Sequence, residues 1–135
     1  MLLYGYMRGI KVNIESTNSL VLAYLGDSVY EIYIRSYLIN KGDYKVNDLQ
    51  HLAIDYVSAV SQSKYLKMFM DKNILTDVEL DVVMRARNHK GNRHPKNTDI
   101  VTYKLATGLE ALFGYLFLEK RYDRIKELMD LIVGE

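Results

Sequence analysis

A ten-residue run early in the chain, residues 22–31, constrains the fold more than any other part of the sequence. Its apolar residues recur as on the buried face of a helix, yet Gly26 and Asp27 lie in the middle of the run. An isolated carboxylate beside an apolar wall is costly to desolvate, so Asp27 needs a partner, a cation or access to water. A second acid, Glu110, has similar apolar neighbours in residues 109–116. The two acids therefore either share one metal-binding site or face solvent in separate places.

The composition is that of one globular domain. The chain has 135 residues, of which 49% are hydrophobic and 26% charged, and a net charge of +1 argues against indiscriminate coating of nucleic acid. It has no cysteine, which excludes disulfides, thiolate metal sites and cysteine nucleophiles. No apolar stretch approaches the roughly 18 residues of a membrane span. Residues 1–10 do not resemble a secretory signal, so we expect a cytoplasmic protein without membrane association.

The hydrophobic periodicity predicts an all-α fold. A capping residue at Asn18 or Thr17 opens the first helix, and Thr76 followed by Glu79 is a capping-box pattern that opens the fourth. The expected helices cover about residues 18–40, 47–57, 58–71, 76–88, 99–116 and 122–133.

A competing interpretation makes Gly26 and Asp27 the turn of a β-hairpin between residues 20–25 and 29–34. We favour a helix, because Asp27, Glu31 and Arg35 recur at four-residue spacing and form one polar stripe.

The two acids allow two interpretations at this point. Each lies on a thin polar seam of an apolar helix, and Gly26 and Gly114 would let another backbone approach closely. The seams are either solvated faces with a weak surface ion network, or they meet so that Asp27 and Glu110 bind Mg²⁺ jointly. Magnesium keeps several waters and takes one or two carboxylates plus substrate phosphate oxygens. Periodicity does not distinguish between these interpretations.

Two motifs resemble those of the ribonuclease III family. Residues 25–29, Leu-Gly-Asp-Ser-Val, resemble the family signature, and residues 110–114, Glu-Ala-Leu-Phe-Gly, resemble its second acidic motif. The similarity extends over about residues 18–133, and residues 23–27, 95–99 and 114–120 resemble the miniature branch of the family. Both motifs and the basic connector between them occur in the family's order.

The chain departs from the family pattern at two acidic positions. Family members usually carry a glutamate where this chain has Ala23 and an aspartate where it has Thr107. Only two of the four acids remain, so we expect RNA phosphate to complete the metal site. The miniature branch shares both losses, and we interpret them as a property of that branch.

The resemblance implies an all-α homodimer with the ribonuclease III endonuclease-domain fold, which cleaves double-stranded RNA with Mg²⁺. Residues 1–17 would form an N-terminal extension and residues 18–135 the catalytic domain, without a double-stranded-RNA-binding domain. The implied substrate is the large-subunit ribosomal RNA precursor, whose ends such enzymes mature. The need for a ribosomal-protein cofactor stays open. The alternative functions are a non-catalytic RNA-binding scaffold of the same fold and a helical interaction module.

We predict Asp27 and Glu110 as the catalytic, metal-organising carboxylates. Glu31 could orient a water molecule behind them or pair with Arg35 at the surface. Thr107 could hydrogen-bond a water in place of the missing acid or pack in the core. We expect the twelve tyrosines mostly to pack rather than to stack on bases.

A basic stretch between the two motifs is the candidate RNA-binding segment. Double-stranded RNA is recognised mainly by shape, through its phosphates and 2′-hydroxyls, which suits basic and polar side chains on a connector. A solvated charge run is the alternative. The candidate residues are Arg85, Arg87, Lys90, Arg93, Lys96 and Asn97.

Overall fold

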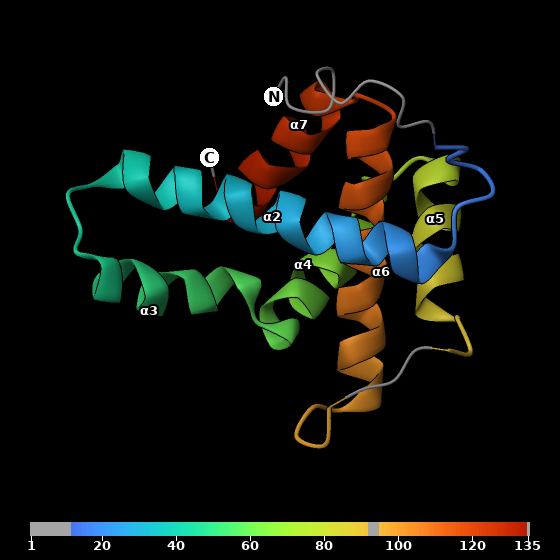
Figure 1. Ribbon diagram of the computed structural model, residues 1–135, viewed down its shortest axis with the longest axis horizontal. Coiled ribbons are helices and arrows are strands. Elements are labelled where there is room, and N and C mark those ends of the chain that lie inside the picture. The colour runs from blue at the N-terminus through green and yellow to red at the C-terminus, as the bar shows by residue number, and fades with distance from the viewer. Residues whose placement is uncertain (1–11, 92–94, 135) are drawn as a thin grey trace.

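The chain folds into helices whose positions follow the sequence periodicity. Figure 1 shows the computed structural model, which describes residues 12–91 and 95–134. These residues contain no strand, so the all-α prediction is confirmed and the β-hairpin interpretation of residues 20–34 is wrong. The helices are α2 (Ser19–Lys41), α3 (Val46–Val57), α4 (Ala59–Asp71), α5 (Asp77–Arg87), α6 (Ile100–Leu118) and α7 (Tyr122–Val133).

Local capping groups set the starts of three helices. The Asn18 side chain accepts a hydrogen bond from the backbone N–H of Leu20 at 2.7 Å and opens α2. Asp99 does the same for the N–H of Thr102 at 3.1 Å and opens α6. The capping box at α5 forms as predicted, because the Thr76 hydroxyl and the Glu79 carboxylate each accept the other's backbone N–H. Short-range hydrogen bonds of this kind explain why the helix starts could be predicted.

The central helix is α6. Eleven of its nineteen residues are buried, including Thr107 and Gly114 from the seam that the sequence suggested was more polar. In Figure 1, α2 crosses α6 near its middle, while α4 and α5 pack against other sides of it. A helix covered on several sides is apolar around most of its circumference, which explains its weak amphipathic pattern.

Two glycines allow α2 and α6 to cross at backbone contact. A Cβ atom added to Gly26 would lie deep inside the Glu110 carbonyl group and 2.8 Å from the backbone nitrogen of Gly114. A Cβ atom on Gly114 would collide in the same way with the Leu22 carbonyl. Backbone atoms cannot move aside like the end of a flexible side chain, so this crossing requires glycine at both positions. The prediction that Gly26 and Gly114 permit a close approach is confirmed.

The C-terminal helix α7 is joined to the start of α5 by a buried ion pair. The Arg124 guanidinium donates to both Glu79 carboxylate oxygens at 2.9 Å and to the Ile74 carbonyl at 2.7 Å. Burial alone would raise the pKa of Glu79, but hydrogen bonds from Arg124 and Thr76 outweigh it and lower that pKa. The pair holds the last helix against the remainder of the domain.

Candidate functional site

Asp27 and Glu110 line one cleft between α2 and α6. Its volume is about 450 Å³, and the described residues that line it come from α2 and α6. The other lining residues are Leu20, Ala23, Tyr24, Tyr103 and Thr107. Ala23 and Thr107, the two positions without the expected acids, thus border the same space as the acids that are present. The convergence follows from the glycine crossing, since Asp27 directly follows Gly26 and the Gly26 backbone meets that of Glu110.

The two acids have different environments. Asp27 is exposed, whereas Glu110 is half-buried. Burial raises the pKa of Glu110 to about 8, and the hydrogen bond and negative charge of Asp27 add to this effect. Two carboxylates within hydrogen-bonding reach do not both ionise readily unless a cation compensates their charge. Glu110 therefore holds its proton at neutral pH when no cation is bound.

Gln62 is a third polar group at this site, and the sequence analysis missed it. It comes from α4, is only 2% exposed, and its side chain hydrogen-bonds to Glu110, which lowers the pKa of that acid. Its spacing to Leu66 and Phe69, both fully buried, places it on the core face of α4. The sequence contained one signal for Gln62: it is a polar residue at a position where the helical periodicity predicts an apolar one.

Tyr24 is an exception to the expectation that the tyrosines mostly pack. It lines the cleft one turn before Asp27, yet it is 82% exposed. The large ring therefore stands at the rim of the cleft, where it can meet a ligand.

The two residues suggested to lie behind the acids have specific partners. Glu31 forms an ion pair with Arg35 at 3.0 Å, as in the surface interpretation, and its charge contributes to the raised pKa of Glu110. Thr107 is buried, and its hydroxyl donates to the Tyr103 carbonyl at 2.9 Å. Its hydroxyl proton is thus already engaged within α6.

The basic candidates lie on the end of α5 and on the connector to α6. Arg85 pairs with Asp81 at 3.0 Å, and the Arg87 guanidinium donates to the Asn88 side chain at 3.1 Å. Lys90, Lys96 and Asn97 are exposed, while Arg93 lies outside the described residues.

The connector begins beside the cleft. A Cβ atom on Gly91 would lie 3.8 Å from the Leu20 side chain, and Leu20 lines the cleft. The start of the connector therefore lies next to a residue that lines the cleft.

The acid pair fits Mg²⁺ better than a metal that needs a full set of protein ligands. Within residues 12–91 and 95–134 there is no group of three or more His, Cys, Asp or Glu side chains arranged to hold a metal. Two oxygen ligands leave most of the coordination sphere to water and substrate phosphate, as Mg²⁺ prefers. Burial and the neighbouring Asp27 raise the pKa of Glu110, and a cation in the cleft would compensate the negative charge of the two side chains.

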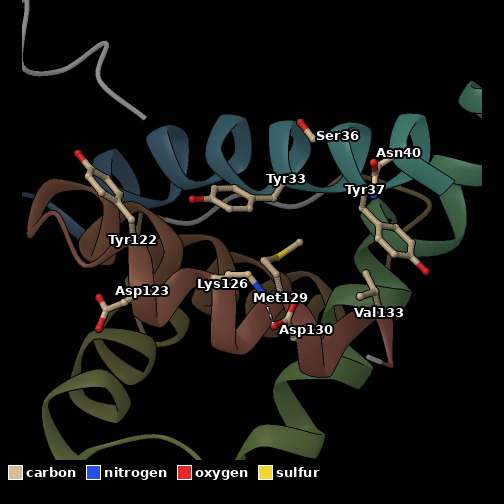
Figure 2. A pocket seen from close by; sticks show the side chains of 10 residues that line it. All are labelled: Tyr33, Ser36, Tyr37, Asn40, Tyr122, Asp123, Lys126, Met129, Asp130 and Val133. Atoms are coloured by element: carbon tan, nitrogen blue, oxygen red, sulfur yellow. Dashed lines mark hydrogen bonds and ion pairs between the residues drawn. The ribbon is translucent and has the colours of Figure 1, made fainter.

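A second groove, of about 560 Å³, lies between α2 and α7 and contains neither acid. Figure 2 shows Tyr33 and Tyr37 on its α2 side and the ion pair between Lys126 and Asp130, 2.8 Å long, on its α7 side. None of the helices in the described part of the chain is long and apolar enough to span a membrane.

Comparisons with known proteins agree with the fold. The ribonuclease III domain family matches residues 20–121. A Mini-ribonuclease 3 from Desulfitobacterium hafniense is 49% identical over 124 residues, which are 90% of this chain and 77% of that protein. The Staphylococcus aureus Mini-ribonuclease 3 is 40% identical over 121 residues, 90% of each chain. A crystal structure of a Fusobacterium nucleatum protein, 31% identical, has a TM-score of 0.80 and covers 92% of this chain and 98% of its own. This chain belongs to the ribonuclease III family of endoribonucleases.

Proposed function

We propose that the protein is a Mg²⁺-dependent endoribonuclease that cleaves double-stranded RNA and matures the ends of the large-subunit ribosomal RNA precursor. The observation that carries this proposal is the meeting of Asp27 and Glu110 in one cleft. The family membership and the relatives named Mini-ribonuclease 3 support it. The alternative is a catalytically weak or inactive RNA-binding scaffold, since two family acids are replaced by Ala23 and Thr107.

Asp27 and Glu110 would hold the cation. Asp27 is open to solvent and to an incoming phosphate, and Glu110 releases its proton when positive charge enters the cleft. When bound, Mg²⁺ lowers the pKa of a water molecule and stabilises charge on the phosphate. Hydrolysis of the phosphodiester leaves a 5′ phosphate and a 3′ hydroxyl.

The RNA would be gripped beside the cleft. Contacts to phosphates and 2′-hydroxyls would come from Lys90, Lys96 and Asn97 on the connector and from Arg85 and Arg87 at the end of α5. Arg93, between Lys90 and Lys96 in the sequence, would add another. Tyr24 adds an exposed aromatic surface at the rim.

A homodimer would use the apolar groove between α2 and α3. The groove has a volume of about 520 Å³, and Ile39, Val46 and Ile54 on it are 56–67% exposed. Large exposed apolar patches mark interaction sites. Glu31 lines this groove and its charge reaches Glu110, so a partner seated there would adjoin the acid cleft.

The deciding experiment incubates the protein with duplexed precursor RNA in Mg²⁺ and in a chelator. The wild type cleaves only with Mg²⁺. Asp27→Asn and Glu110→Gln keep side-chain shape but remove negative charge, so cleavage falls by at least about 10²-fold while RNA binding and folding persist. Glu119→Gln, which changes an exposed acid at the end of α6, is the matched control and retains activity.

Full activity in either acid variant would refute the assignment of that residue. RNA binding by the wild type without cleavage at any Mg²⁺ concentration would favour the scaffold.

A further inference from the structure

We propose that Gln62 is a positioning residue that holds the Glu110 carboxylate in place for the divalent cation. The inference rests on the proposed function, because it concerns the same acid pair. It adds a third helix to the site: α2 supplies Asp27, α6 supplies Glu110, and α4 supplies the amide that holds Glu110.

The burial of Gln62 first calls for an explanation. Its side chain is 2% exposed on the face of α4 that carries Leu66 and Phe69, both fully buried. A buried carboxamide is costly unless its polar atoms are hydrogen-bonded, and an apolar residue of similar volume would pack there at lower cost. The hydrogen bond to Glu110 compensates for that cost and directs the amide at the acid pair.

The chemistry of the contact favours a role toward a cation. The amide N–H is a donor that a carboxylate oxygen of Glu110 can accept, and the amide itself carries no charge. Gln62 can therefore fix the orientation of the Glu110 carboxylate toward a cation without adding a competing negative charge. Carboxylates that bind metals are commonly held by such hydrogen bonds, and loss of the partner typically costs about 10–100-fold in metal affinity.

A neighbouring residue allows this role to be separated from ordinary core packing. Ser63 is also on α4 and is 3% exposed, but its hydroxyl donates to the Val60 carbonyl of its own helix at 2.7 Å. A substitution at Ser63 disturbs a buried polar group of α4 without touching the acid pair.

The test uses the full chain and measures Mn²⁺ binding without RNA by electron paramagnetic resonance. It also measures the Mg²⁺ concentration for half-maximal cleavage of duplex RNA. Gln62→Met keeps the side-chain volume and removes the donor. We expect about 10–100-fold weaker Mn²⁺ binding and a matching rise in the Mg²⁺ requirement. The KM for RNA at saturating Mg²⁺ stays unchanged. Ser63→Ala shifts the melting temperature but neither metal measurement.

A double-mutant cycle tests whether Gln62 acts through Glu110. In a Glu110→Gln background, Gln62→Met causes no further loss of Mn²⁺ affinity, because the carboxylate it positions is absent. If Gln62→Met does not fold, Gln62→Leu replaces it in both measurements. If the wild type binds no Mn²⁺ in the absence of RNA, the test relies on the Mg²⁺ concentration for half-maximal cleavage, which must then differ between the wild type and Gln62→Met.

The inference would be overturned if the folded Gln62→Met protein bound Mn²⁺ as tightly as the wild type and required no more Mg²⁺ for cleavage. A loss in Gln62→Met that is equally large in the Glu110→Gln background would also overturn it. Failure of the proposed function gives a different result, since the wild type would then not cleave RNA at all. The Mn²⁺ comparison would still report on Gln62.

Discussion

Glu110 couples the stability of this protein to pH. Its pKa is about 8 in the folded protein, against an ordinary value of 4.5 for a glutamate in an unfolded chain. Below pH 4.5 both states hold the proton, so the contribution to stability is complete there. As the pH rises toward 8, the unfolded chain loses the proton and the folded one retains it, so stability falls over this window. The loss is on the order of a few kcal/mol.

We therefore expect Glu110→Gln to remove this pH dependence in the absence of metal. Urea unfolding between about pH 5 and 9 in a chelator measures it. The free energy of unfolding of the wild type falls relative to that of the variant as the pH rises to about 8, and added Mg²⁺ restores the wild type. Parallel curves for the two proteins would contradict the assigned environment of Glu110.

The acids were identifiable from the sequence at this scale, but their surroundings were not. Asp27 and Glu110 lie in motifs of consecutive residues. Gln62 and Tyr24 are not distinguished by a motif, since a glutamine or tyrosine in a helix is usually solvated or packed. Only the positions of the neighbouring helices show that Gln62 faces Glu110 and that Tyr24 faces solvent.

At the element scale, the crossing of α2 and α6 brings the site together. Gly26→Ala inserts a methyl group into the Glu110 backbone, and Gly114→Ala inserts one into that of Leu22. We expect each to lower the free energy of unfolding by about 1–3 kcal/mol or more, even after the gain of about 1 kcal/mol in helix propensity. Cleavage falls further than stability explains, because the helices separate and the acids move apart.

Chemical unfolding and cleavage rates on the same preparations measure both effects. The control is Gly42→Ala, where the added Cβ atom meets only the exposed Tyr44 ring, at 3.1 Å. A flexible side chain can move away, so this variant keeps wild-type stability and activity. Wild-type stability of Gly26→Ala would show that the crossing tolerates a side chain.

On the scale of the whole molecule, the proposed role of the connector in RNA binding leads to a prediction about salt dependence. Lys90→Gln and Lys96→Gln together remove two exposed positive charges from the connector. RNA affinity weakens, and the slope of log affinity against log salt concentration becomes shallower by about one for each lost phosphate contact. Binding titrations with Asp27→Asn protein, which does not cut the RNA, measure this slope.

Lys72→Gln, an exposed lysine at the end of α4, is the control and leaves the slope unchanged. An unchanged slope in the double connector variant would show that its lysines are merely solvated.

The apolar groove between α2 and α3 predicts self-association. Ile39→Asp with Ile54→Asp places two charges on it, and burying unpaired charge is costly. We expect the wild type to be a dimer and this variant a monomer by light scattering after size exclusion, and we expect the variant to cleave duplex RNA more slowly. Leu131→Asp charges another exposed apolar residue, on α7, and leaves the dimer intact. A dimeric Ile39→Asp, Ile54→Asp variant would place the interface elsewhere.

The sequence by itself determined the helices, their caps and the identity of the acid pair. Periodicity and capping act over a few residues, as the bonds from Asn18 to Leu20 and between Thr76 and Glu79 illustrate. The tertiary structure alone decided that Asp27 and Glu110 share one cleft, that Glu110 is half-buried, and that Gln62 reaches it from α4. The reason is physical: burial and electrostatic coupling depend on distances between helices, and the packing around α6 sets those distances.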